Sequence, residues 1–200
     1  SSDVCSSDLG KVEPDQRRNQ LFLNQGNWKF KESAAALGID DPSYSTQAAF
    51  FDFDRDGDLD LFLLNHSTKK VDNLEFARYR NEIDPYAGCK MYENAGGHFN
   101  DISGSAGINR SGLTFGLGVV VSDINMDGWP DLYVTNDYNE PDHLYLNTGH
   151  KSFQDAGDQA LSHMSQFSMG ADIADYNNDG LPDIMTLDML PEDNRRQKLL

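Results

Sequence analysis

The sequence predicts an all-β protein, and specifically a partial β-propeller built from four-stranded blades. Three observations favour this fold. An acidic loop with one fixed frame occurs three times, short apolar strands flank each copy, and a second repeated element has the signature of a β-hairpin. Two strands joined by an acidic loop and two joined by a hairpin turn give four short strands per unit. A radial stack of such units is a β-propeller.

The acidic loops share a frame of nine residues, with Asp or Asn at positions 1, 3, 5 and 9 and Gly at position 6. Loop 1 covers residues 52–60, loop 2 covers 123–131 and loop 3 covers 175–183. Each loop should join two short strands, because apolar and β-branched residues precede and follow it. We expect strands before the loops at 48–51, 119–122 and 171–174, and strands after the loops at 61–64, 132–135 and 184–187.

The hairpin element consists of an apolar-aromatic strand, an Asn-x-Gly turn and a second short strand that carries Phe. Its three copies begin at Gln20, Lys90 and His143. The sequence thus divides into the hairpin that ends one blade (10–45), a blade with loop 1 (46–110), a blade with loop 2 (111–165), and the first half of a further blade that leads into a helix or linker (166–200). Such a chain cannot close a ring by itself, so the remaining blades of the same propeller are expected partners.

Residues 1–9 are set apart from the fold prediction, because they repeat Ser-Ser-Asp, match nothing downstream and resemble translated adapter sequence. No signal peptide is visible, and we expect the chain to be a fragment of a longer protein. Small residues lead into two of the first strands, at Gly116, Gly118 and Gly170, as expected for an innermost strand close to the propeller axis. The connection over 65–89 is long and should project as a surface loop, either for recognition or as a tolerated insertion.

The charge balance excludes some functions and favours others. Acidic residues outnumber basic ones by 33 to 16, which argues against nucleic acid as a partner because a phosphate-binding protein needs a basic face. A third of these acids lie in the three loops, so the acidity indicates local cation binding rather than a solvating tail. No apolar run is long enough to span a membrane. Cys5 and Cys89 form neither a disulfide framework nor a metal-ligand pattern.

The loop frame suits Ca2+, which prefers six to eight oxygen ligands at flexible distances. Alternation places side chains 1, 3 and 5 inside the turn, glycine at position 6 takes the sharp bend, the carbonyl of position 7 faces the ion and Asp at position 9 closes the shell. We therefore predict about one Ca2+ per loop, three in the chain. The predicted ligands are Asp52, Asp54, Asp56, Asp58 and Asp60; Asp123, Asn125, Asp127, Trp129 and Asp131; and Asp175, Asn177, Asp179, Leu181 and Asp183, with Asp58, Trp129 and Leu181 contributing backbone oxygens.

Other interpretations of the loops fit less well. An EF-hand needs Glu at position 12 and flanking helices, whereas position 12 is Leu63, Val134 or Thr186 and the flanks are strands. Magnesium demands near-ideal octahedral geometry, and zinc prefers His or Cys, which the loops lack. A simple Asp/Asn-Gly hairpin turn explains one copy, but three copies in one frame favour Ca2+. Loop 1 should bind most tightly, because it carries the most carboxylates.

The expected affinity also indicates a location. Extracellular calcium modules typically have dissociation constants of about 10⁻⁴ to 10⁻³ M. Cytosolic calcium would leave such sites largely empty, so we expect an extracellular, cell-surface or periplasmic protein.

The frame Asp-x-(Asp/Asn)-x-Asp-Gly-x-x-Asp-(Leu/Ile), followed by the Leu-(Phe/Tyr)-x-Asn-x-Gly hairpin, resembles FG-GAP or VCBS repeats. Such repeats build the propeller of integrin α chains and of many bacterial surface proteins. The stretches 136–142 (Asn-Asp-Tyr-Asn-Glu-Pro-Asp) and 187–191 (Leu-Asp-Met-Leu-Pro) are most similar to the bacterial branch that often carries a C-terminal ASPIC/UnbV domain and is related to cartilage acidic protein. The resemblance covers about residues 19–190, and it implies calcium-supported structure and extracellular binding but no reaction.

Two classes of function follow. The first is a non-catalytic interaction or adhesion scaffold that binds a protein or glycan ligand. The alternative is the propeller portion of a secreted or surface enzyme that acts on polysaccharides, a lyase or a glycosidase, because propellers also host such chemistry. The acids outside the loops form no recognisable pair and no nucleophile motif occurs, so we assign no catalytic residue. Calcium within a catalytic centre stays open as a third possibility.

Overall fold

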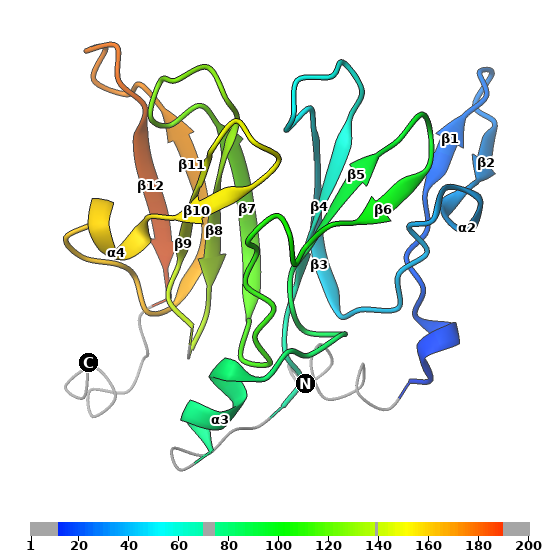
Figure 1. Ribbon diagram of the computed structural model, residues 1–200, viewed down its shortest axis with the longest axis horizontal. Coiled ribbons are helices and arrows are strands. Elements are labelled where there is room, and N and C mark those ends of the chain that lie inside the picture. The colour runs from blue at the N-terminus through cyan, green and yellow to red at the C-terminus, as the bar shows by residue number, and fades with distance from the viewer. Residues whose placement is uncertain (1–11, 70–74, 139, 190–200) are drawn as a thin grey trace.

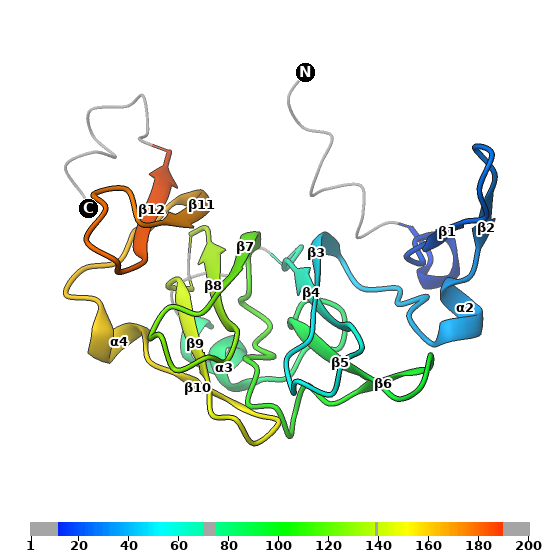
Figure 2. The same ribbon diagram turned by 90° about the horizontal axis from the view of Figure 1, so that it is seen from above.

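The computed structural model describes residues 12–69, 75–138 and 140–189. Within these ranges the strands form two four-stranded antiparallel sheets, with a two-stranded sheet at each end of the series. The sheets follow one another along an arc (Figures 1 and 2), so the structure is the partial β-propeller that the sequence predicts. The expected adapter sequence at 1–9, and the helix or linker expected after residue 189, lie outside the described residues.

Each complete blade begins with the strand that precedes an acidic loop. The first blade contains β3 (Ser45–Phe51), β4 (Asp60–Asn65), β5 (Lys90–Asn94) and β6 (Phe99–Asp101). The second blade contains β7 (Gly116–Ser122), β8 (Asp131–Asn136), β9 (His143–Asn147) and β10 (Phe153–Asp155). In both blades the acidic loop joins the first two strands and the Asn-x-Gly turn joins the last two, as expected from the repeat pattern.

The two-stranded sheets are halves of blades. The N-terminal half-blade contains β1 (Phe22–Asn24) and β2 (Phe30–Glu32), which correspond to the outer pair of a complete blade. The C-terminal half-blade contains β11 (Ser168–Ala174) and β12 (Asp183–Asp188), which correspond to the inner pair and enclose loop 3. Pairing follows one register throughout. Leu61 of β4 lies opposite Tyr92, and Leu132 of β8 lies opposite Tyr145.

Each unit begins with one of the strands β3, β7 and β11, and β7 contacts both β3 and β11 along the inside of the arc. Glycine is needed at the start of β7, the middle one of these strands. A Cβ on Gly116 would lie 2.3 Å from Leu64 Cδ1, and a Cβ on Gly118 would lie 3.1 Å from the Cα of Gly170 in the next unit. These close approaches confirm the expected crowding at Gly116 and Gly118, whereas a Cβ on Gly170 would have no atom within 4 Å.

Apolar side chains pack between the blades rather than within them. The main cluster joins Phe62, Leu64 and Met91 of the first blade to Val119, Leu132, Val134 and Tyr145 of the second. A related cluster joins Tyr133 and Leu144 of the second blade to Ala171, Ile173 and Ile184 of the C-terminal half-blade. Each unit thus presents one apolar face to the next, which is how a propeller builds a continuous core.

The helices are short and lie in connections. They are η1 (Pro14–Gln16), α2 (Ala34–Leu37), α3 (Phe76–Asn81) and α4 (Gly157–Ala160). The connection over 65–89, which the sequence predicts to project as a surface loop, contains α3. Residues 76–81 contain neither Gly nor Pro, and Ala and Arg favour helix. No helix in the described part of the chain has the length and apolar character needed to cross a membrane.

Candidate metal sites

The three acidic loops have the same backbone conformation and all lie on one side of the arc, at the top of Figure 1. Glycine at position 6 has a φ of 97°, 89° and 88° in loops 1, 2 and 3, which confirms its role in the sharp bend. Position 4 is also left-handed, with φ of 62° at Arg55, 61° at Met126 and 61° at Asn178. The sequence did not reveal this second bend, because Arg and Met rarely adopt positive φ.

The carboxylate at position 1 organises each turn. Asp52 accepts hydrogen bonds from the backbone N–H of Asp56 and of Gly57, both at 3.1 Å. Asp123 and Asp175 accept the corresponding pair of bonds, at 2.9–3.0 Å in both loops. The side chain at position 3 accepts a further bond from the N–H of position 5 in all three loops. Oxygen atoms of positions 1 and 3 are therefore held on the inside of the turn.

The carboxylate at position 9 joins the loop to the third strand of its blade. Asp60 is fully buried and accepts hydrogen bonds from Phe53 N at 3.0 Å and from Asn94 N at 2.9 Å. Asp131, also fully buried, accepts the equivalent bonds from Ile124 N and Asn147 N, both at 2.8 Å. Sequence reasoning treated position 9 as a ligand alone and missed this connection between strands.

Loop 1 brings three predicted ligands together. Asp52, Asp54 and Asp60 each offer a carboxylate oxygen, and these three atoms lie within 4.8 Å of one another. The carboxylate of position 5 instead caps the N–H of position 7, as Asp56 does for Asp58 at 3.1 Å. The same cap recurs at Trp129 in loop 2 and at Leu181 in loop 3. In loop 2 the Asn125 amide also donates to Asp127 Oδ2 at 2.9 Å.

Two segments of the chain, residues 2–63 and 123–186, match the FG-GAP-like repeat family. The chain belongs to this family. Each matched segment ends in the strand that follows an acidic loop, β4 after loop 1 and β12 after loop 3. A search of curated proteins found no match.

The first FG-GAP loop is also tied to the second blade. Lys151, in the turn between β9 and β10, places its Nζ 2.7 Å from Asp54 Oδ2 and pairs with Glu93 as well. The Asn147 amide donates to Phe53 O at 2.8 Å, and the Arg55 guanidinium lies 5.3 Å from the ring of Trp129. The count of charges in loop 1 omitted Lys151, because this contact depends on how blades pack and leaves no local signal in the sequence.

Burial makes the charged form of the position 9 carboxylates costly in these repeats. The pKa of Asp60 is raised to about 6, with burial as the largest cause; Asp54 and Asp56 also raise it, while the N–H groups of Asn94 and Phe53 act in the opposite direction. Burial likewise raises the pKa of Asp131. A bound cation would favour the ionised form at these positions.

In the presence of chelator, the Asp60 carboxyl is expected to titrate near pH 6. Its pKa in the folded protein lies above that of an unfolded chain. Between about pH 4 and about pH 6 the carboxyl group is therefore protonated in the folded state and ionised in the unfolded chain. The group therefore adds stability as the pH falls through about 6 and loses this contribution as the pH rises. The ¹³C shift of the carboxyl carbon measures the titration, and a midpoint near pH 4 would contradict the effect of burial.

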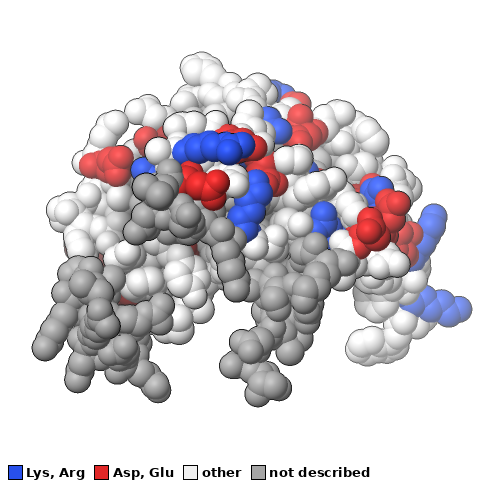
Figure 3. All heavy atoms as spheres, turned by 90° about the horizontal axis from the view of Figure 1, so that it is seen from below, with Lys and Arg blue, Asp and Glu red and all other residues white. Residues whose placement is uncertain are grey.

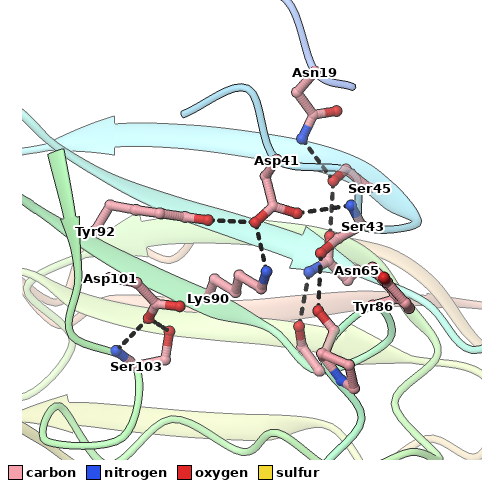
Figure 4. A network of polar contacts seen from close by, with 12 residues as sticks. Asn19, Asp41, Ser43, Ser45, Asn65, Tyr86, Lys90, Tyr92, Asp101 and Ser103 are labelled. Carbon is pink, nitrogen blue, oxygen red and sulfur yellow. Dashed lines mark hydrogen bonds and ion pairs between the residues drawn. The ribbon is translucent and has the colours of Figure 1, made fainter. Parts of the chain in front are cut away.

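Buried carboxylates outside the loops act as hydrogen-bond centres. Asp41 accepts bonds from Lys90 Nζ and Tyr92 OH, both at 2.5 Å, and from Ser43 N at 2.7 Å (Figure 4). This network attaches the segment after β2 to the first blade. Sequence reasoning did not single out Asp41, because an isolated acid in a connection carries no recognisable pattern.

The most enzyme-like cluster of titratable groups surrounds His143. Its Nδ1 lies 2.6 Å from Asp155 Oδ2, and its Nε2 lies 3.1 Å from the amide nitrogen of Asn109. The Asn109 amide also donates to Glu140 Oε1 at 2.9 Å. Both ring nitrogens thus face protein partners, and the cluster holds residue 109 against the second blade.

Proposed function

We propose that the three acidic loops bind Ca2+, one ion per loop, and that these ions stabilise the FG-GAP propeller. The observation that carries the proposal is the convergence of Asp52, Asp54 and Asp60 in loop 1, repeated in backbone conformation by loops 2 and 3. The converging donors are all oxygen atoms, which suits Ca2+ better than zinc. The carbonyls of position 7 would complete the shells.

The cation would have a structural role. Position 1 belongs to the loop, position 9 begins the second strand, and the same position 9 carboxylate accepts the N–H of a residue in the third strand. An ion that holds positions 1, 3 and 9 together would therefore fix the loop against two strands of its blade. The residues act by binding and orienting, and no chemical step is assigned to them.

We infer further that the protein is a non-catalytic interaction or adhesion scaffold in an extracellular, surface or periplasmic setting, with a protein or glycan ligand. The connection over 65–89 supports this proposal, because α3 lies on the side of the arc opposite the loops (Figure 1). On this face Lys and Arg side chains lie next to Asp and Glu (Figure 3). Within this connection the exposed side chains of Arg78 and Glu82 form an ion pair, with Arg78 Nε 3.8 Å from Glu82 Oε2. An exposed, mixed-charge projection of this kind suits recognition.

Equilibrium dialysis with Ca2+ tests the binding proposal. We expect three ions per chain with dissociation constants of about 10⁻⁴ to 10⁻³ M. Replacing the position 1 carboxylate by its amide (Asp52→Asn, Asp123→Asn or Asp175→Asn) should weaken one site at a time, because each change removes one ligand charge. Asp158→Asn, an exposed acid outside the loops, is the matched control. Binding that is absent, or that responds equally to the control, would refute the proposal.

A further inference from the structure

The carboxylate at position 3 of loop 1 is paired with a lysine from the neighbouring blade. Loops 2 and 3 have Asn at this position, Asn125 and Asn177, so loop 1 alone of the three carries a charge there. Asp54 Oδ1 accepts the N–H of Asp56 at 3.3 Å, and Asp54 Oδ2 lies 2.7 Å from Lys151 Nζ. The additional carboxylate of loop 1 thus coincides with an additional cation.

Burial shows that Asp54 depends on a positive charge. The Asp54 side chain is 2% exposed, although it belongs to a loop, whereas the Lys151 side chain is 56% exposed. A buried carboxylate is costly unless it is paired with a cation or coordinates a metal. Either Lys151 or a bound ion can provide the charge that Asp54 requires.

The backbone fixes the position of the lysine. Lys151 has a left-handed φ of 57° in the turn between β9 and β10. Thr148 closes this turn, because its N–H and its Oγ1 donate to Ser152 O at 2.9 and 3.0 Å. Gly149 packs against loop 2, since a Cβ there would lie 3.0 Å from Trp129 Cε2. The turn therefore contacts both loop 1 and loop 2, and this packing holds Lys151 against loop 1.

Lys151 has a second acceptor that is not a predicted metal ligand. Its ammonium group also pairs with Glu93 of β5, whose side chain is 26% exposed. Glu93 directly precedes Asn94, the residue whose N–H donates to the position 9 carboxylate of loop 1. The lysine therefore keeps an acidic partner if Asp54 turns to an ion.

Asp54 would have to serve two cations. Its carboxylate also belongs to the group of three, with Asp52 and Asp60, whose oxygen atoms lie within 4.8 Å of one another. An ion in this group and the ammonium group of Lys151 are attracted to the same carboxylate and repel each other. Each cation therefore weakens the binding of the other.

We propose that Lys151 is an internal counter-ion of loop 1, which neutralises Asp54 when no ion is bound and lowers the affinity of loop 1 for Ca2+. The inference rests on the calcium binding proposed above and adds how one of the sites is regulated. The lysine offsets the high affinity that the charge count predicts for loop 1. Because Lys151 belongs to the second blade, binding at loop 1 is coupled to the contact between blades.

A Ca2+ titration of the full chain followed by NMR tests the competition, because the amide signals of Gly57, Gly128 and Gly180 report on one loop each. Lys151→Met keeps the length of the side chain and removes its charge. The dissociation constant at Gly57 should fall by roughly 10-fold, as expected when a unit charge about 5 Å from a divalent ion is removed in salt solution. The other two constants should change by less than about two-fold. Lys29→Met, exposed in the turn between β1 and β2, removes the same charge and should leave all three constants unchanged.

Thermal unfolding in chelator tests the counter-ion role without any bound ion. Under this condition Lys151→Met should lower the midpoint by about 1–4 °C, because the clustered carboxylates lose a pairing charge. Saturating Ca2+ should remove most of this difference, so the rise on adding Ca2+ should be larger in the variant than in the parent chain. Lys29→Met should unfold like the parent under both conditions.

Glu93→Gln tests the role of the second acceptor. In the parent chain this change should weaken Ca2+ binding at loop 1, because the displaced lysine loses its alternative partner. In the Lys151→Met background the weakening should be at least about three-fold smaller. Equal weakening in both backgrounds would show that Glu93 acts through its own charge and would overturn its role as the second acceptor.

The outcomes separate this inference from the calcium proposal. Ca2+ binding at Gly57 that Lys151→Met leaves unchanged would overturn the counter-ion role alone, as would an unchanged midpoint in chelator. A parent chain in which loop 1 binds no Ca2+ would overturn the calcium proposal for this loop, and the competition with it.

Discussion

Phe53→Ala is expected to lower the free energy of unfolding by about 3–5 kcal/mol, the usual cost of removing a fully buried aromatic side chain. Phe53 occupies position 2 of loop 1, is fully buried, and stacks on Phe153 with ring centroids 6.1 Å apart. Its removal opens a cavity between the first and second blades. Urea unfolding followed by fluorescence gives the change in free energy.

Leu59→Ala is the matched control, because Leu59 lies in the same loop and is 54% exposed. Its effect should stay within about 0.5 kcal/mol. If Phe53→Ala and Leu59→Ala lowered the free energy of unfolding equally, the destabilisation would come from the loop as a whole and not from the contact between blades.

Asp142→Ala is expected to cost about 3–4 kcal/mol, since it leaves several buried donors without an acceptor. The Asp142 carboxylate accepts bonds from Tyr133 OH at 2.9 Å, Asn136 N at 2.8 Å and Ser168 Oγ at 2.7 Å. Ser168 belongs to β11, so the loss should also loosen the C-terminal half-blade.

Hydrogen exchange of β11 amides together with urea unfolding measures both consequences of Asp142→Ala. Asp158→Ala, an exposed acid in α4, should change neither. Unaltered exchange in β11 would contradict the role assigned to Asp142 as a link between blades.

Local chemistry made the strand pattern predictable. Asp-Gly and Asn-x-Gly turns recur along the chain at short intervals. The apolar segments between these turns are therefore long enough only for short strands. The strand ends at these turns were found within about one residue. The starts of the strands that precede the loops were less accurate. β7 begins at Gly116, whereas the sequence indicated 119, because Gly has a low strand propensity and pairing with β8 holds it in place.

Features that depend on distant parts of the chain could not be predicted. The contact of Lys151 with Asp54 requires two blades to be packed together. The buried centres Asp41 and Asp142 are recognisable only once their donors surround them. The positive φ of Arg55 follows from the geometry of the turn and not from the residue type.

The candidate site was predictable in part. Spacing identified positions 1, 3 and 9 of loop 1, which converge as expected. It did not separate a carboxylate that caps the turn, such as Asp56, from one that joins strands, such as Asp60. Both functions arise from hydrogen bonds to the backbone, which spacing alone does not specify. The bound cation and the blade boundaries remain predictions.

Thermal unfolding in Ca2+ and in chelator tests the proposed calcium-supported propeller most directly. At about 1 mM free Ca2+, a site with a dissociation constant of about 10⁻⁴ M contributes roughly 1.4 kcal/mol, and three such sites contribute about 4 kcal/mol. For a chain of this size the midpoint should rise by about 8–16 °C relative to chelator, with a much smaller rise in equimolar Mg2+. A midpoint that is the same in Ca2+ and in chelator would contradict the proposal that cations in the acidic loops stabilise the blades.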